Sequence, residues 1–319
     1  MIKSALSIHP NLNLIATPWS PPSFMKDNNN MNHGRKLLPK YKQMWVNYIC
    51  KYIEEYKKEN ININFLTVQN EPSATQSWES CIFSPEEMSE FLNTNLIPTF
   101  KQNNIDTKIL LWDHNKDNIL NGVTTIFNNL FSDDLVAGIG YHWYTGDHFD
   151  NLTLLKKLYP DKLLINTERC TGYSNFRESD EIINAKLYSH DIIGNLNSGS
   201  SGEVDWNMLL DYNGGPNHKK NNCASHIMLS KDNSDYIKHL SYYYIAHFSK
   251  YILPGAKKVE HSSYTKNLDI ISFKNTDNSI VIVILNTNNF SVNYTISIES
   301  LYLKDIINSH SIISYVLKK

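Results

Sequence analysis

Two glutamates in this sequence each stand at the end of an apolar run. Glu71 follows the stretch FLTVQN (65–70), and Glu168 closes the stretch KLLINTE (162–168). Cleavage of a glycosidic bond requires two facing carboxyl groups: one donates a proton to the leaving oxygen, and the other attacks the anomeric carbon or activates water. The donor needs a raised pKa, and its partner must stay ionised. The sequence does not give their separation, which would be about 5–5.5 Å for retention and about 6.5–9.5 Å for inversion.

Polar and aromatic side chains stand at the ends of the other predicted strands. In chain order these ends carry Trp19, Asn70, Asp113-His114, His142-Trp143-Tyr144 and Trp206-Asn207. Asn70 is suited to hydrogen-bond a sugar hydroxyl, and Tyr144 is suited to donate a hydrogen bond to an ionised Glu168. The tryptophans are suited to line a sugar pocket, because aromatic rings offer a large flat apolar face.

Each of these residues also has a simpler structural interpretation. A glutamate at a strand end is commonly a salt-bridge partner or a helix cap, His142 alone is commonly a structural histidine, and tryptophans commonly belong to cores. The stripe of Tyr48, Tyr52 and Tyr56 recurs every fourth residue and predicts helix packing with no functional role.

The strand ends belong to a regular alternation of strands and helices. Predicted strands cover residues 11–18, 64–70, 108–113, 137–144, 162–168 and 202–208. Predicted helices cover residues 41–60, 119–130, 152–158, 181–195 and 236–251, and one more begins at the capping sequence SPEE (84–87). Nearly uninterrupted apolar strands between helices indicate a parallel sheet covered on both faces. In a (β/α)8 TIM barrel the C-terminal ends of such strands meet at one mouth, where catalytic residues lie.

The pattern changes after about residue 253. Residues 268–274, 279–286, 291–298 and 311–317 read as short strands with polar turns and no helices between them, which predicts an antiparallel β-sandwich. We therefore expect an α/β chain with two domains, a partial TIM-barrel catalytic domain over residues 1–252 and a β-sandwich domain over residues 253–319. Pro254-Gly255 lies at the predicted joint.

Composition excludes several classes of protein. The 319 residues carry a formal net charge of −2, so neither a basic nucleic-acid-binding surface nor an acidic tail is indicated. The four cysteines show no metal-binding spacing, although a single disulfide remains open. The sequence has no run of 18 apolar residues, so no transmembrane helix is predicted. The first residues lack the basic-then-apolar pattern of a signal peptide.

Six blocks of sequence resemble the acid β-glucosylceramidases of glycosyl hydrolase family 30. In order they are ATPWSPPSFMK (16–26), FLTVQNEPSA (65–74), YHWY (141–144), INTERC (165–170), VDWNMLLDYNGGPNH (204–218) and YYIAHFSKYILPGAKKV (243–259). The blocks follow the family's order and spacing, and the resemblance runs from about residue 5 to the end. The resemblance does not include the family's more N-terminal part, which carries the first two barrel strands, an early strand of the β-domain, a signal peptide and a glucose-binding aspartate. We therefore expect a fragment of the full enzyme, with a barrel lacking its first two strands.

The resemblance implies a role for each matching residue. Glu71 would be the acid/base and Glu168 the nucleophile of a retaining mechanism, and Asn70 would bind the sugar. The aromatic residues Trp19, Trp143 and Trp206 would line the pocket, and His142 and Tyr144 would support the nucleophile. Asn221 matches a further pocket amide, in a stretch (HKKNN) where the similarity is looser.

The resemblance also implies a substrate and partners. The substrate would be glucosylceramide, cleaved to glucose and ceramide in sphingolipid metabolism, with no metal or other cofactor. The full-length animal enzymes are lysosomal and work with an activator protein on an acidic lipid surface. Two alternatives remain: a family 30 hydrolase acting on another β-glycoside, such as a xylan or a β-1,6-glucan, and a non-catalytic remnant that binds a glycolipid or a protein.

Overall fold

The computed structural model describes residues 1–172 and 180–318. It divides into two compact units, Met1–Thr167 and Glu168–Lys319, which are described separately. The predicted domain boundary at residues 252/253 rests on the sequence pattern and stays a prediction. In the described part of the chain, no helix combines the length and apolarity needed to cross a membrane.

The first unit is built on parallel strands. They are β1 (Ile15–Ala16), β2 (Phe65–Thr67), β3 (Lys108–Asn115), β4 (Val136–His142) and β5 (Leu163–Glu168), and they lie in this order in the sheet. Strand β6 (Gly202–Glu203) belongs to the second unit. The pairings β1–β2, β2–β3 and β3–β4 are parallel, as predicted. β1 is shorter than the predicted strand 11–18. Pro18, Pro21 and Pro22 follow it, and proline has no N–H to donate to a sheet ladder.

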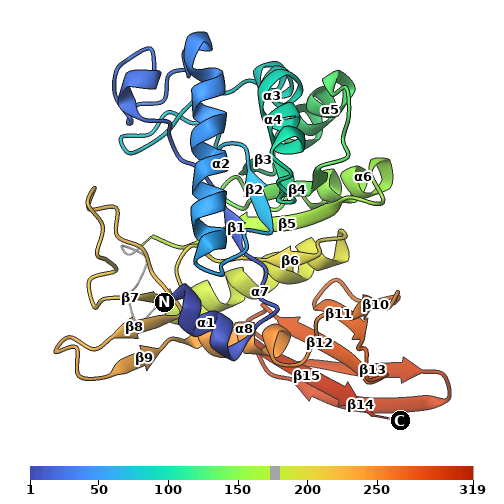
Figure 1. Ribbon diagram of the computed structural model, residues 1–319. Helices are drawn as coiled ribbons and strands as arrows, with labels where there is room; N and C mark the ends of the chain where they lie inside the picture. The colour runs from blue at the N-terminus through green and yellow to red at the C-terminus, as the bar shows by residue number, and fades with distance from the viewer. Residues whose placement is uncertain (173–179, 319) are drawn as a thin grey trace. The chain divides into compact units, whose positions relative to one another are not determined.

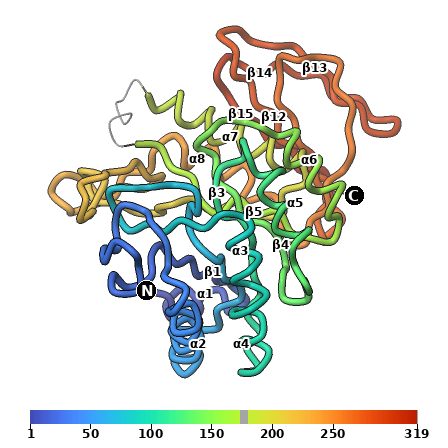
Figure 2. Tube along the Cα trace, turned by 90° about the horizontal axis from the view of Figure 1, so that it is seen from above, coloured from blue at the N-terminus to red at the C-terminus, as the bar shows by residue number. Residues whose placement is uncertain are grey.

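Helices follow one another in chain order along the strands of this unit (Figures 1 and 2). They are α2 (Lys42–Lys58), α3 (Pro85–Phe91), α4 (Ile97–Gln102), α5 (Ile119–Asn129) and α6 (Phe149–Leu158), with α1 (Ile2–Ile8) near the N-terminus. Short helical segments cover Ser23–Met25, Pro39–Tyr41 and Leu92–Leu96. The predicted cap is confirmed, because Ser84 and Glu87 form a reciprocal capping box at the start of α3.

The core of this unit lies between helix α2, the segment from α3 to α4, and strands β2 and β3. Trp45, Val46 and Ile49 of α2 pack in one buried cluster with Leu66 of β2 and Ile109 of β3. Tyr48 and Tyr52 of the tyrosine stripe lie at the exposed edge of this cluster, where Tyr48 stacks on Trp45 with 5.3 Å between ring centroids.

Among residues 168–172 and 180–318, the second unit contains two helices and three small sheets. The helices are α7 (Glu181–Asn197) and α8 (Leu240–Ser249), and a three-stranded sheet is formed by β7 (Leu209–Leu210), β8 (Ile227–Leu229) and β9 (Tyr236–Lys238). The helix predicted over 236–251 thus begins only at Leu240, because Tyr236–Lys238 pairs antiparallel with β8.

The C-terminal part of this unit is all β. Strands β10 (Lys257–Lys258), β11 (Asp269–Lys274), β12 (Ile280–Asn286) and β15 (Ser311–Leu317) form one antiparallel sheet, and β13 (Val292–Ile298) and β14 (Leu301–Ile307) form a hairpin. One face of β11 and β12 packs on α7 and α8, and the other packs on side chains of β13. This arrangement is the predicted β-sandwich.

Candidate active site

The backbone around Glu71 is fixed from both sides. The N–H of Glu71 donates to the carbonyl of Asp113, 2.9 Å away, at the end of β3. The Gln69 side chain donates to the carbonyls of Trp19 (2.7 Å) and Asn70 (2.9 Å), which ties the loop after β2 to the segment after β1. Glu71 itself has a positive φ of 44°, an uncommon conformation for a non-glycine residue. The sequence QNE therefore holds one carboxyl group in a defined position at the strand end.

A β-bulge in β3 turns Asp113 toward β4 and β5. Trp112 and Asp113 have φ values of 73° and 57°, and the register with β4 shifts at this point. The Asp113 carboxylate accepts a hydrogen bond from the Thr167 hydroxyl (2.6 Å) and lies 3.3 Å from Nε2 of His142. Gly140 makes room for this group, since a Cβ there would lie 2.9 Å from Thr167 and 3.3 Å from Asp113.

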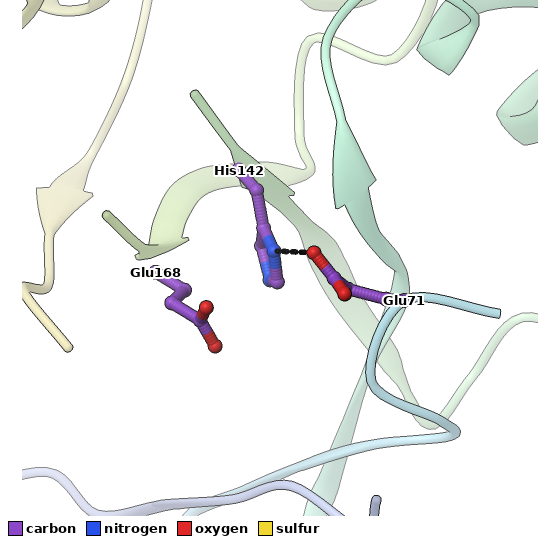
Figure 3. Close-up of side chains that lie close together, drawn as sticks. All are labelled: Glu71, His142 and Glu168. Atoms are coloured by element: carbon purple, nitrogen blue, oxygen red, sulfur yellow. Dashed lines mark ion pairs between the residues drawn. The ribbon is translucent and has the colours of Figure 1, made fainter. Parts of the chain in front are cut away.

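His142 joins this bulge to Glu71. Its side chain is buried, and Nδ1 lies 3.5 Å from Oε1 of Glu71, as Figure 3 shows. Gln76 donates a hydrogen bond to the other carboxylate oxygen at 3.3 Å. Burial raises the pKa of Glu71, but the contact with His142, the charges of His142 and His114, and the Gln76 hydrogen bond together hold this pKa below its usual value.

This direction differs from the raised pKa expected of a proton donor. The expectation followed from the role of a proton donor alone, whereas two histidines close to the carboxylate favour its ionised form. In the unliganded protein Glu71 is therefore held mainly as a carboxylate at neutral pH.

Glu168 is the last residue of β5, and its backbone continues directly from Thr167. Glu71, His142 and Glu168 each offer one side-chain atom, and these atoms lie within 4.8 Å of one another. The three labelled side chains lie close together in Figure 3. The structure thus brings together the two glutamates singled out in the sequence.

One histidine and two carboxylates are also a possible donor set for a metal ion. The two ring nitrogens of His142 already lie close to carboxylate oxygens, Nδ1 to Glu71 and Nε2 to Asp113. This favours a network of ionisable side chains, and the expectation that no metal is used stays a prediction.

The other predicted site residues differ in exposure. Asn70 and Trp143 are buried, Trp19 is half-buried, and Tyr144 and Trp206 are about 40% exposed, at 41% and 40%. The ring of Tyr144 lies edge-on to His142, with 6.0 Å between ring centroids. The predicted hydrogen bond from Tyr144 to Glu168 stays a prediction.

Trp206 and Asn221 belong to the second unit. The N–H of Trp206 donates to the carbonyl of Arg169 at 2.9 Å, and the N–H of Asn221 lies 3.3 Å from the side-chain oxygen of Asn217. The Asn221 side chain is exposed.

Sequence reasoning missed a buried ionic cluster directly after Glu168. The Arg169 side chain is 1% exposed and pairs with Glu203 (2.9 Å), Asp191 (3.6 Å) and Asp205. His226 lies 2.8 Å from Asp205 on its far side. This cluster connects the residue after Glu168 to α7, to β6 and to the segment that carries Trp206.

The acidic members of this cluster have different pKa values. Burial raises the pKa of Glu203 to about 8, and the nearby charge of Asp191 acts in the same direction while Arg169 opposes it. Burial also acts to raise the pKa of Asp205, but Arg169 and His226 outweigh burial and lower it. Glu203 is therefore largely protonated at neutral pH, whereas Asp205 is ionised.

Family comparisons agree with this architecture. Residues 1–252 match the model of the glycosyl hydrolase family 30 TIM-barrel domain, and residues 255–315 match that of the glycosyl hydrolase family 30 β-sandwich domain. The chain therefore belongs to glycosyl hydrolase family 30. The predicted fold class, a TIM-barrel domain followed by an antiparallel β-sandwich domain, is confirmed.

Among curated relatives, the chain is 32% identical to putative glucosylceramidase 4 of Caenorhabditis elegans, over 87% of this chain and 56% of that protein. It is 29% identical to the lysosomal acid glucosylceramidase of Mus musculus, over 97% of this chain and 63% of that protein. The chain thus spans less than two thirds of the length of either relative.

Among solved structures, SrfJ from Salmonella typhimurium is 35% identical with a TM-score of 0.95, covering 100% of this chain and 72% of SrfJ. The endo-β1,6-glucanase BT3312 is 28% identical with a TM-score of 0.86, covering 100% of this chain and 74% of that one. The chain is therefore similar to proteins whose names refer to different substrates.

Proposed function

We propose that this chain carries the catalytic pair of a retaining β-glycosidase, with Glu71 as acid/base and Glu168 as nucleophile. The observation that supports the proposal most strongly is the approach of their side-chain atoms to within 4.8 Å. Retaining glycosidases hold their two carboxyl groups about 5–5.5 Å apart, whereas inverting enzymes need about 6.5–9.5 Å to fit a water molecule.

In the first step the proton of Glu71 passes to the glycosidic oxygen while the Glu168 carboxylate attacks the anomeric carbon. The bond to the leaving group breaks, and the sugar is joined to Glu168 as an ester. In the second step Glu71, now a carboxylate, takes a proton from water, and the resulting hydroxide cleaves the ester. Both glutamates return to their starting states, and no metal or other cofactor takes part.

His142 and Asp113 would position Glu71 and set its proton affinity. Because the positive charge of His142 lowers the pKa of Glu71, loading of the catalytic proton is favoured at acidic pH. Asn70, next to Glu71, has a buried side-chain oxygen without a hydrogen-bond partner among the residues that the structure describes, which suits it to accept a hydrogen bond from a sugar hydroxyl. Trp19, Trp143 and Trp206 would contact the sugar ring.

We propose glucosylceramide as the substrate, because two relatives bear the name glucosylceramidase. The proposal extends to a lysosomal setting, with an activator protein and an acidic lipid surface as partners. The second candidate is a β-1,6-glucan, supported by the similarity to an endo-β1,6-glucanase. A non-catalytic binding remnant is the third alternative.

The test is to offer the purified protein glucosylceramide in detergent micelles, a β-1,6-glucan and a xylan, and to follow the anomeric configuration of the released sugar by NMR. We expect release of β-glucose from glucosylceramide and loss of at least about 10³-fold in kcat for Glu168→Gln. Release of the α-anomer would contradict the retaining mechanism. Faster turnover of a glycan would indicate that the glycan, and not glucosylceramide, is the substrate. Binding without turnover would favour a non-catalytic binding remnant.

A further inference from the structure

Two cysteines of the second unit lie in contact. The Sγ atoms of Cys170 and Cys223 are 3.6 Å apart, although 53 positions separate them in the sequence. In the described residues neither forms a disulfide. Thiols this close can be joined by small side-chain rotations, provided that the backbones are already near each other.

The backbones are held near each other by hydrogen bonds. Gly172 and Cys223 form an antiparallel bridge, and the N–H of Ala224 donates to the carbonyl of Thr171 at 2.9 Å. On its other side, the N–H of Cys223 donates to the carbonyl of Gly214 at 2.9 Å. The two thiols are therefore paired by the local fold.

The other two cysteines provide an internal contrast. Cys50 and Cys81 are buried in the first unit, where burial raises the pKa of Cys50 and raises that of Cys81 to about 11. The hydrogen bond from Cys170 instead lowers the pKa of Cys223, against the opposing effects of burial and of the Glu168 charge. Because the thiolate is the reactive form, reactivity is favoured at the pair and disfavoured at Cys50 and Cys81.

We propose that Cys170 and Cys223 form a reversible disulfide by exchange with a low-molecular-weight disulfide such as oxidised glutathione. One protein thiolate attacks a sulfur of the small disulfide, which releases the first small thiolate and leaves a mixed disulfide. The second protein thiolate attacks the protein sulfur of that mixed disulfide and releases the second small thiolate. Two protein thiols are oxidised, one small disulfide is reduced, and the two protons pass to the released thiolates.

The position of the pair connects it to the proposed site. Cys170 follows Glu168 by two residues, and Cys223 follows Asn221 by two residues. Resting on the proposed function, the cross-link would tie the chain beside the nucleophile to the segment that carries Asn221. It would also restrict the unfolded chain across a long loop, which stabilises the folded state.

The experiment incubates the intact protein with oxidised glutathione, blocks the remaining thiols by alkylation, and maps peptides by mass spectrometry without reduction. We expect one cross-linked peptide pair containing Cys170 and Cys223, with Cys50 and Cys81 alkylated. The melting temperature should rise by roughly 5 °C on oxidation and return after reduction.

Cys170→Ser and Cys223→Ser should each abolish the cross-linked peptide and the temperature rise, whereas Cys50→Ser, the matched control, should leave both unchanged. Glutathione adducts on Cys170 and Cys223 without a cross-link, or a cross-link through Cys50 or Cys81, would overturn the proposal. Because the peptide map does not depend on hydrolysis, Glu168→Gln should still form the disulfide, and failure of either proposal can be recognised separately.

Discussion

Glu71 in the first unit and Glu203 in the second are both largely enclosed glutamates next to a cationic group. Each side chain is 13% exposed, yet the pKa of Glu71 is lowered and that of Glu203 is raised to about 8. Burial favours the neutral form of both. Their charged neighbours differ.

Glu71 faces His142 and His114 and accepts a hydrogen bond from Gln76, so its ionised form has several partners. Glu203 shares one guanidinium with Asp191 and Asp205. Ionisation of Glu203 would add a third negative charge beside a single guanidinium, which disfavours its ionised form. The same residue type is thus held ionised at neutral pH in one place and largely protonated in the other.

Replacing Glu71 by Gln should lower kcat by about 10²–10⁴-fold on a glucoside with a poor leaving group, because the proton donor is lost. The loss should be smaller for an aryl glucoside whose leaving group departs without protonation. Initial rates on both substrates check this. An equal loss on the two substrates would argue that Glu71 does not donate the proton.

Replacing Glu203 by Gln should change stability with pH while leaving the catalytic groups in place. A carboxyl group whose pKa is raised in the folded protein contributes stability at low pH and loses it as pH rises through the folded value. The wild type should therefore lose on the order of 3 kcal/mol between pH 5 and pH 8 from this group, and the Gln variant should not.

Urea unfolding at both pH values measures this difference. Equal pH dependence of the free energy of unfolding in the two proteins would contradict the assignment of a protonated Glu203.

Replacing His142 by Gln should move the alkaline limb of the kcat/KM profile to higher pH. The limb reports loss of the proton from Glu71 in the free enzyme, and without His142 burial raises the pKa of Glu71 against fewer opposing neighbours. Glu203→Gln is the control and should leave the limb where it is. A shift to lower pH would show that His142 does not lower the pKa of Glu71.

Prolonged dialysis against EDTA should leave turnover unchanged, because the proposed mechanism uses no metal. Loss of activity that Zn²⁺ or Mn²⁺ restores would instead assign Glu71, His142 and Glu168 to a metal site.

The sequence alone located both glutamates, because an apolar strand that ends in a carboxylate is a local pattern. It also located the helix start at Ser84, since the capping box lies within four residues. The stripe of Tyr48, Tyr52 and Tyr56, predicted to serve helix packing, packs on aromatic rings of its own helix and is only partly covered. Tyr48 and Tyr52 are exposed, at 55% and 37%, although Tyr48 stacks on Trp45, and Trp45 and Ile49 enter the core. Periodicity identified the helix without identifying its buried side.

The surroundings of the glutamates were beyond sequence reasoning because they depend on distant residues. Asp113 turns toward His142 because of a β-bulge with two positive φ values. No local residue pattern predicts this bulge. The cluster around Arg169 gathers acids from α7 and from the segment after it. The pKa of Glu71 was therefore expected in the wrong direction, since its histidine neighbours come from other strands.

Trapping the glycosyl-enzyme intermediate tests directly whether Glu168 is the nucleophile. The protein is incubated with a 2-deoxy-2-fluoro-β-glucoside bearing an activated leaving group, which slows hydrolysis of the intermediate, and is then digested and sequenced by mass spectrometry. We expect one fluoroglucosyl group on Glu168, absent from Glu168→Gln. A stable adduct on another residue, or turnover with inversion and no adduct, would contradict this expectation.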